Sequence, residues 1–247
     1  PLMDLRAMSH TELLDQLLTG HGERQKQVRR VLTERGAVIG RDLEAWRMAH
    51  PQTPAQLQAL WMYQSLNQVE PTLLRSLLED EDGRVRAAAV RVLSFWQASL
   101  PDGAALLAAR VKDAHPRVRL EAIRALAKVG TGWAAATALQ VLEQPMDRFL
   151  DYALWLTMND LAAPWVDAVA SGAWKVSEEN RAALEFGLTA IPGNQAAQIL
   201  EPMTASLHPN ALAEGPWMQL IAKAGTRPQL NRLMRIAADP STSESVV

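Results

Sequence analysis

The chain has 247 residues, of which 48% are hydrophobic and 21% charged, and its formal net charge is −2. This composition is typical of a globular protein and argues against a disordered or fibrous chain. Because the chain has no cysteine, disulfides, zinc–thiolate sites, iron–sulfur clusters and thiol catalysis are excluded within it. No apolar stretch approaches the roughly 20 residues of a membrane helix. A start at Pro1 without a signal-like segment leads us to expect a piece of a longer polypeptide.

Helical periodicity predicts about fifteen helices and no strands. Ser9 and Thr53 each begin a sequence typical of a capping box, and Gly36, Gly130 and Gly225 fall where helices are expected to end. The helices are expected near residues 9–18, 23–35, 40–49, 54–68, 71–79, 84–99, 102–112, 116–129, 132–143, 146–159, 163–170, 178–190, 194–206, 211–223 and 228–238.

Residues 80–93 and 113–126 are two copies of one pattern, and seven of their fourteen positions are identical. In each copy an aspartate and a turn precede apolar residues spaced along one face of a helix. These apolar residues are Val85, Ala89, Val92, Leu93 and Trp96 in the first copy, and Val118, Ala122, Ala125, Leu126 and Val129 in the second.

Two helices in every 30–40 residues, without strands, predict an all-α fold in which helix pairs stack on one another. We expect an α-solenoid, a HEAT-like or armadillo-type superhelix of about seven helix pairs. It should cover residues 1–238, with the strongest repeats in 71–130. Residues 239–247 are expected to form a flexible tail.

The segment 113–126 closely resembles the second-helix region of a HEAT repeat. In that family, the aspartate and the arginine six residues later often form a hydrogen-bonded ladder between neighbouring repeats. The resemblance therefore implies a structural ladder of Asp80, Arg86, Asp113 and Arg119. The flanking copies lack this pair, so the implied ladder covers two repeats only.

A narrower resemblance covers about residues 9–190 and rests on the runs 59–64, 86–93 and 145–155. These runs are similar to the HEAT-repeat region of large exported bacterial proteins. Such proteins combine a sorbosone/glucose-dehydrogenase-like propeller, this helical region and a c-type haem domain. The resemblance implies a helical spacer in a putative membrane-bound dehydrogenase, and a periplasmic or exported location.

The ionisable residues do not form a catalytic or metal-binding pattern. No two of the five histidines have the i, i+3 or i, i+4 spacing that would place both on one metal, and no nucleotide-binding or nucleophile motif occurs. Asp147 and Asp151 lie four residues apart, but Asp147 also suits the positive end of a helix. We therefore predict no catalytic, cofactor-binding or metal-binding residue, and no cofactor.

Tryptophan is unusually frequent, since 8 of the aromatic residues are Trp, against 2 Tyr and 3 Phe. Trp61 and Trp96 lie on apolar stripes and are expected in the core. A further aromatic cluster has two interpretations, a bulky junction between repeats or a surface that docks a partner, because Trp and Tyr dominate protein interfaces. Its members are Phe149, Tyr152, Trp155, Trp165 and Trp174.

Three functions are compatible with these features. The favoured one is a non-catalytic scaffold that contacts adjacent domains or another protein, without nucleic-acid binding or membrane insertion. The second is a free-standing module that binds a peptide or protein. The third is a HEAT-like DNA glycosylase, which needs a basic surface; the net charge of −2 argues against it. The arginines available for such a surface are Arg24, Arg29, Arg30, Arg84, Arg86, Arg91, Arg117, Arg119 and Arg124.

Overall fold

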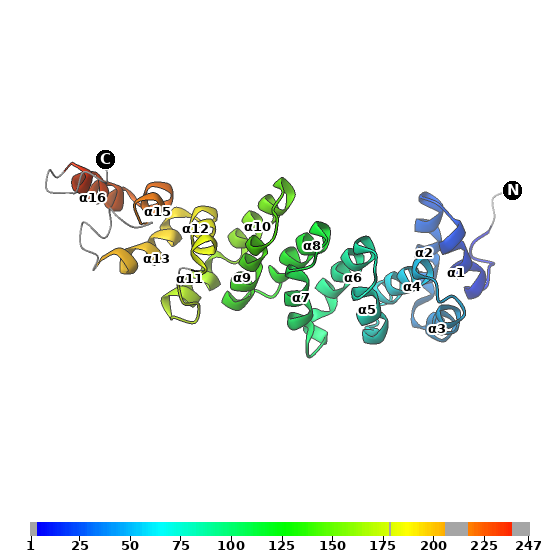
Figure 1. The fold of residues 1–247 in the computed structure, drawn as a ribbon. Coiled ribbons are helices and arrows are strands. Elements are labelled where there is room, and N and C mark those ends of the chain that lie inside the picture. The colour runs from blue at the N-terminus through cyan, green and yellow to red at the C-terminus, as the bar shows by residue number, and fades with distance from the viewer. Residues whose placement is uncertain (1–3, 178, 206–216, 239–247) are drawn as a thin grey trace. The chain divides into compact units, whose positions relative to one another are not determined.

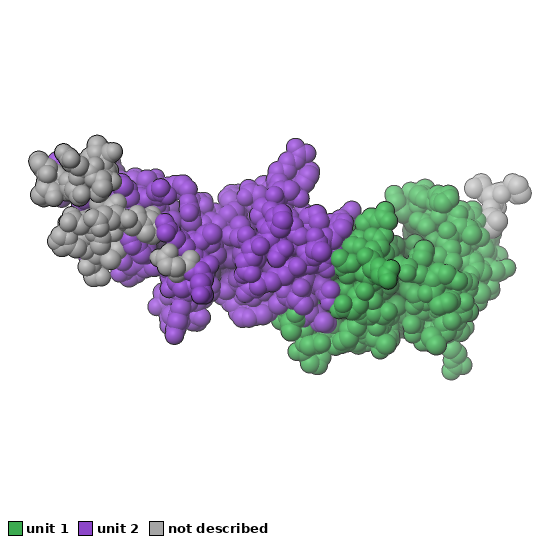
Figure 2. Space-filling view, in the orientation of Figure 1, with its two compact units in different colours: residues 1–105 green, residues 106–247 purple. Residues whose placement is uncertain are grey.

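The structure, a computed structural model, describes residues 4–177, 179–205 and 217–238, and every regular element in those ranges is a helix (Figure 1). The chain divides into two compact units, residues 1–105 and 106–247 (Figure 2). No described helix combines the length and the apolar character that crossing a bilayer requires. In each unit, helices pack against their neighbours in sequence.

Unit 1 is built from short helices joined by tight turns. The helix α1 begins at the predicted capping box, in which Ser9 Oγ accepts from the Glu12 amide and the Glu12 carboxylate accepts from the Ser9 amide. The helix α2 ends at Gly36, whose φ of 68° glycine adopts without strain. The elements of unit 1 are α1 (His10–Thr19), α2 (Glu23–Arg35), η1 (Gly36–Ile39), α3 (Gly40–Ala49), α4 (Thr53–Ser65), α5 (Pro71–Leu78), α6 (Gly83–Trp96) and η2 (Gln97–Ser99). The boundary between the units falls inside α7 (Gly103–Val111).

The helices of unit 2 form two layers (Figure 1). In one layer α10 contacts α8 and α12, and in the other α11 contacts α9 and α13. At the end of the unit, α15 contacts α12, α13 and α16. The elements are α8 (Pro116–Leu126), α9 (Gly132–Leu139), η3 (Gln140–Glu143), α10 (Arg148–Asp160), α11 (Ala162–Ala170), α12 (Arg181–Ala190), α13 (Gly193–Ala205), α15 (Trp217–Ala224) and α16 (Arg227–Ala237).

The predicted apolar stripes form the core faces of α6 and α8. All five residues of the first stripe are buried, from Val85 to Trp96. In the second stripe the four residues from Val118 to Leu126 are buried, whereas Val129 follows the end of α8 and is partly exposed. The helical period therefore identified the core correctly up to the last helical residue.

Two glycines allow neighbouring helices of unit 2 to approach closely. A Cβ at Gly132 would lie 2.5 Å from both the Ala168 Cβ and the Pro164 carbonyl oxygen, so α9 packs against α11 with no room for a side chain. A Cβ at Gly187 would lie 2.3 Å from the ring of Trp165. The glycine in α12 therefore makes the space that this indole occupies.

The stacked helices confirm the predicted all-α solenoid class, with some differences in detail. The predicted capping box at Thr53 is wrong, because α4 already begins at Thr53 after an N-cap at Gln52. The hydroxyl of Thr53 donates instead to the carboxylate of Asp80. The helix expected near 178–190 begins at Arg181, and the helix expected near 211–223 is described only from Trp217. The expected tail at 239–247 lies outside the described residues, and a single solenoid over 1–238 stays a prediction.

Candidate functional site

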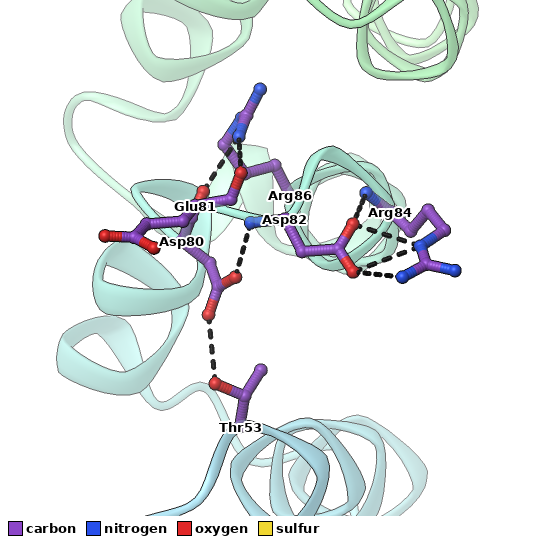
Figure 3. Close-up of polar contacts among 6 residues, drawn as sticks. All are labelled: Thr53, Asp80, Glu81, Asp82, Arg84 and Arg86. Carbon is purple, nitrogen blue, oxygen red and sulfur yellow. Dashed lines mark hydrogen bonds and ion pairs between the residues drawn. The ribbon is translucent and has the colours of Figure 1, made fainter.

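The turn before α6 is held by hydrogen bonds from both members of the first Asp–Arg pair (Figure 3). The Asp80 carboxylate accepts from the Asp82 amide at 2.8 Å. The Arg86 Nη1 donates to the carbonyl oxygens of Asp80 and Glu81, at 2.8 and 3.0 Å. Asp82 then caps the helix by accepting from the Arg84 amide. The pair thus bonds both polar groups of the turn's backbone, its amide and its carbonyls.

The turn before α8 repeats this geometry. The Asp113 carboxylate accepts from the His115 amide at 2.8 Å, and the Arg119 Nη1 donates to the carbonyl oxygens of Asp113 and Ala114, at 2.8 and 3.0 Å. His115 takes the capping role, since its Nδ1 accepts from the Arg117 amide. The sequence identity between the two copies therefore corresponds to one hydrogen-bonded turn built twice.

Both turns also bond to a neighbouring helix pair of the same unit. In unit 1 the second oxygen of the Asp80 carboxylate accepts from the Thr53 hydroxyl at the start of α4. In unit 2 the Arg119 Nη2 donates to the carbonyl oxygen of Pro145, which precedes α10, at 2.7 Å. Arg119 is only 3% exposed, and the Asp113 carboxylate lies 3.9 Å from Arg110. A ladder that joins all four predicted residues stays a prediction.

Unit 1 contains a polar cluster that the sequence analysis missed. The Tyr63 hydroxyl and the Arg47 guanidinium both donate to the Glu44 carboxylate, and each has a contact of 2.7 Å. The hydrogen bonds from Arg47 and then from Tyr63 lower the pKa of Glu44, whereas burial raises the pKa of Tyr63. The i, i+3 spacing of Glu44 and Arg47 is a local signal, but Tyr63 reaches the pair from another helix.

The outer surface of α10 carries three large exposed aromatic side chains, which we call the α10 aromatic face: Phe149, Tyr152 and Trp155. They are 60, 63 and 41% exposed, and their spacing of three residues places them on one side of the helix. The rings of Tyr152 and Trp155 stack at 6.0 Å, and the Arg148 guanidinium lies 4.6 Å from the Phe149 ring. The face is therefore an exposed aromatic surface on one side of α10.

Trp165 does not belong to this surface. Its side chain is fully buried against Gly187, so the prediction that Trp165 contacts a partner is wrong. Trp174 is partly exposed, and its ring is tilted against that of Trp165 at 5.5 Å. The five aromatic residues thus separate into an exposed group on α10 and a packed pair beside α11.

Several arginines considered for a DNA-binding surface bind groups of the protein itself. Arg124 donates to the Thr157 hydroxyl and lies 2.9 Å from the Asp160 carboxylate. Arg29 donates to the Gln58 side chain at 2.6 Å, and its guanidinium lies 5.5 Å from the Trp61 ring. These contacts reduce the basic surface that a duplex would meet.

Carboxylates and histidines that could take part in catalysis or metal binding have structural contacts in the described residues. Asp147 caps α10 by accepting from the first amides of that helix, which supports the structural interpretation of this residue. His10 bonds to Asp42 at 2.5 Å, and the His50 ring stacks on Trp46 at 4.7 Å. Within the ranges that the structure describes, no three His, Asp or Glu side chains are grouped as metal ligands.

Comparison with known proteins identifies the repeat. A family model described as HEAT repeats matches residues 70–150, the segment from α5 to the start of α10 that includes both Asp–Arg turns. None of the curated proteins compared with this chain matches it. Residues 70–150 are therefore similar to HEAT repeats, a family whose members generally mediate protein–protein interaction.

Proposed function

We propose that the chain is a non-catalytic scaffold that binds a protein through its helical surface, with the α10 aromatic face as the main contact. The observation that carries this proposal is the exposure of Phe149, Tyr152 and Trp155 on one side of a single helix. Exposed aromatic groups of this size are uncommon unless another molecule covers them, and Tyr and Trp lose little conformational entropy on binding.

The aromatic face also has the polar features of an interface. Tyr152 and Trp155 each carry a polar group at the edge of a large apolar ring, and Arg148 lies beside Phe149. Arginine is the charged residue most enriched with Tyr and Trp at the centres of interfaces. A partner with apolar side chains framed by carboxylates fits this chemistry.

The partner that we propose is an adjoining domain of a larger exported redox protein. This part of the proposal rests on the resemblance of residues 9–190 to the HEAT-repeat region between a dehydrogenase-like propeller and a c-type haem domain. In that setting the helical segment holds two redox domains at a fixed separation, and the electron transfer takes place in those domains.

Site-specific photocrosslinking tests the proposal. Tyr152 is replaced by benzoylphenylalanine in the native protein, and Met48, an exposed apolar residue of unit 1, is replaced in the matched control. We expect a crosslink from position 152 to a second folded domain and none from position 48. Mass spectrometry then identifies whether that domain is in the same polypeptide, as a spacer requires, or in a separate protein, as a free-standing module requires.

Two results would contradict the scaffold. One is the absence of any crosslink from position 152 in the native protein, since the aromatic face would then be open to solvent. The other is submicromolar binding of duplex DNA at physiological salt, measured by fluorescence anisotropy. Such binding would favour the glycosylase hypothesis, because non-specific DNA binding under these conditions is typically about 1–100 μM.

A further inference from the structure

Unit 2 contains a groove that is separate from the α10 aromatic face. The groove has a volume of about 840 Å³ and lies between α9, η3, the segment after α11 and the start of α12. We call it the α9–α12 groove. Its volume is within the range of about 300–1,000 Å³ that is typical of ligand sites.

Small side chains create this hollow. The helices α9 and α11 are in contact through Gly132, but the residues that surround the groove carry at most a methyl group at many positions. Those residues are Gly132, Ala136, Ala168, Ala173, Ala182 and Ala183. In a helical protein, Ala supplies helix propensity without filling space, so the backbones enclose a volume that the side chains leave open.

Two tryptophans provide the large apolar surfaces of the groove. Trp133 lies in the first turn of α9 and is 48% exposed. Trp174 is partly exposed and is held in place by a hydrogen bond from its amide to the Ala168 carbonyl, at 2.9 Å. Because neither indole is buried by the groove's own residues, both keep ring surface that a ligand can cover.

The two charged residues in the described part of the lining are both acidic. They are Glu143, whose carboxylate accepts from Lys112 at 2.8 Å, and the exposed Glu179. Hydrogen bonds within the neighbouring loop support the position of Glu179: Asn180 accepts from the Ser177 amide and donates to the Lys175 carbonyl, at 2.8 and 2.7 Å. Among the lining residues that the structure describes, none is Lys, Arg or His. Because Glu143 already binds Lys112, the charge that favours a cationic ligand is that of Glu179.

We propose that the α9–α12 groove binds a short segment of a partner protein that presents an apolar side chain next to a lysine or arginine. The apolar side chain covers the rings of Trp133 and Trp174, and the cation lies near Glu179, where it also meets the electron-rich face of an indole. This inference deepens the proposed scaffold function and rests on it. It assigns a second contact, with its own specificity, to the groove between α9, η3 and the start of α12.

Three synthetic nonapeptides of matched length test the chemistry, each labelled with fluorescein and titrated with the whole chain by fluorescence polarisation. The first is Gly-Ser-Leu-Arg-Leu-Arg-Leu-Ser-Gly, the second replaces both arginines by glutamate, and the third replaces all three leucines by serine. We expect the first peptide to bind at least about tenfold more tightly than either of the others. Its affinity should fall as salt is added, because the ion pair with Glu179 is exposed.

Variants of the chain locate the binding to the groove. Ala136→Leu fills the groove from α9 without changing a charge, and Glu179→Gln removes the exposed carboxylate from the rim. We expect Glu179→Gln to weaken binding of the first peptide by about threefold to tenfold. We expect Ala136→Leu to weaken it by more than about tenfold. The matched controls are Ala45→Leu and Glu201→Gln, at exposed positions of α3 and α13, which should leave the affinity unchanged. Circular dichroism establishes that the helix content of each variant is that of the parent.

Several outcomes would overturn the inference: no binding of the first peptide up to about 1 mM, equal binding of the glutamate peptide, or unchanged binding by a folded Ala136→Leu variant. If Ala136→Leu does not fold, Glu179→Gln decides, because its side chain is on an exposed loop. The crosslink from position 152 is independent of the groove. If the peptide does not bind but the crosslink forms, only the proposal of a binding groove is rejected. If the crosslink does not form, the scaffold function is rejected.

Discussion

Arg119→Ala is the substitution that most directly tests the hydrogen-bonded turn. The change removes a guanidinium that donates to three carbonyl oxygens, those of Asp113, Ala114 and Pro145. Arg119 is only 3% exposed. A lost hydrogen bond from a charged group costs about 1.5–3 kcal/mol. The three losses are not additive, because Ala114 and Pro145 are exposed and water can bind their carbonyl oxygens in the variant. The variant is also relieved of the cost of burying a charge, which the parent bears.

The expected decrease in the free energy of unfolding is therefore about 2–4 kcal/mol, from the lost bonds and the buried methylenes of the side chain together. Equilibrium urea denaturation followed by circular dichroism measures it, and the m-value reports whether the transition has kept its cooperativity. Hydrogen exchange of the α8 and α10 amides assigns the loss to unit 2.

Arg117→Ala is the matched control, since Arg117 is an exposed arginine on the same helix. Its stability should change by less than about 0.5 kcal/mol. Arg119→Lys keeps the charge but lacks the planar set of N–H donors of a guanidinium. We therefore expect an intermediate decrease in the free energy of unfolding. If Arg119→Ala is no more destabilising than Arg117→Ala, solvent satisfies these carbonyls and the proposed role of the arginine in the turn is refuted.

Three further predictions concern other sites. Tyr63→Phe should lower the free energy of unfolding by about 1 kcal/mol at neutral pH. Because hydrogen bonds from Arg47 and then Tyr63 lower the pKa of Glu44, this stabilisation is present above the unfolded pKa of the carboxylate and is lost as the pH falls through its folded pKa. In urea denaturation, the difference between the variant and the parent should therefore shrink below about pH 4. Asp147→Ala removes the cap of α10 and should lower the melting temperature by an amount equivalent to about 1 kcal/mol, whereas Asp147→Asn should retain most of the cap. Gly187→Ala places a methyl group 2.3 Å from an indole ring and should destabilise the chain by about 1–3 kcal/mol; an unchanged denaturation midpoint would mean that α12 is free to shift.

The sequence predicts those parts of the fold that depend on local spacing. The stripes of α6 and α8, the capping box at Ser9 and the helix end at Gly36 each depend on residues within a few positions of one another, and the structure contains all of them. The error at Thr53 has a different origin. Its hydroxyl has two competing uses, a local cap or a bond to Asp80, which is 27 residues away, and periodicity contains no information about the second.

The candidate sites depend on distant residues and were predicted less completely. Trp165 and Trp155 look alike in the sequence, but a glycine 22 positions after Trp165 opens the space that buries it. No single alanine of the α9–α12 groove indicates a groove in the sequence, because Ala is common in helices of every kind. Only the packing of α9, α11 and α12 places them around one hollow.

The turns before α6 and α8 use main-chain oxygens as acceptors, and this has a consequence for how such an array can grow. Residue 81 is Glu and residue 114 is Ala, yet both offer the same carbonyl to the arginine. Arg119 likewise bonds to the backbone of Pro145, ahead of a helix that lacks the Asp–Arg pair. A copied segment therefore brings its own donor, and an arginine placed like Arg119 needs only a main-chain oxygen in the sequence that follows. Duplication can lengthen the array, and the copies can then diverge, without any matching change in the neighbour.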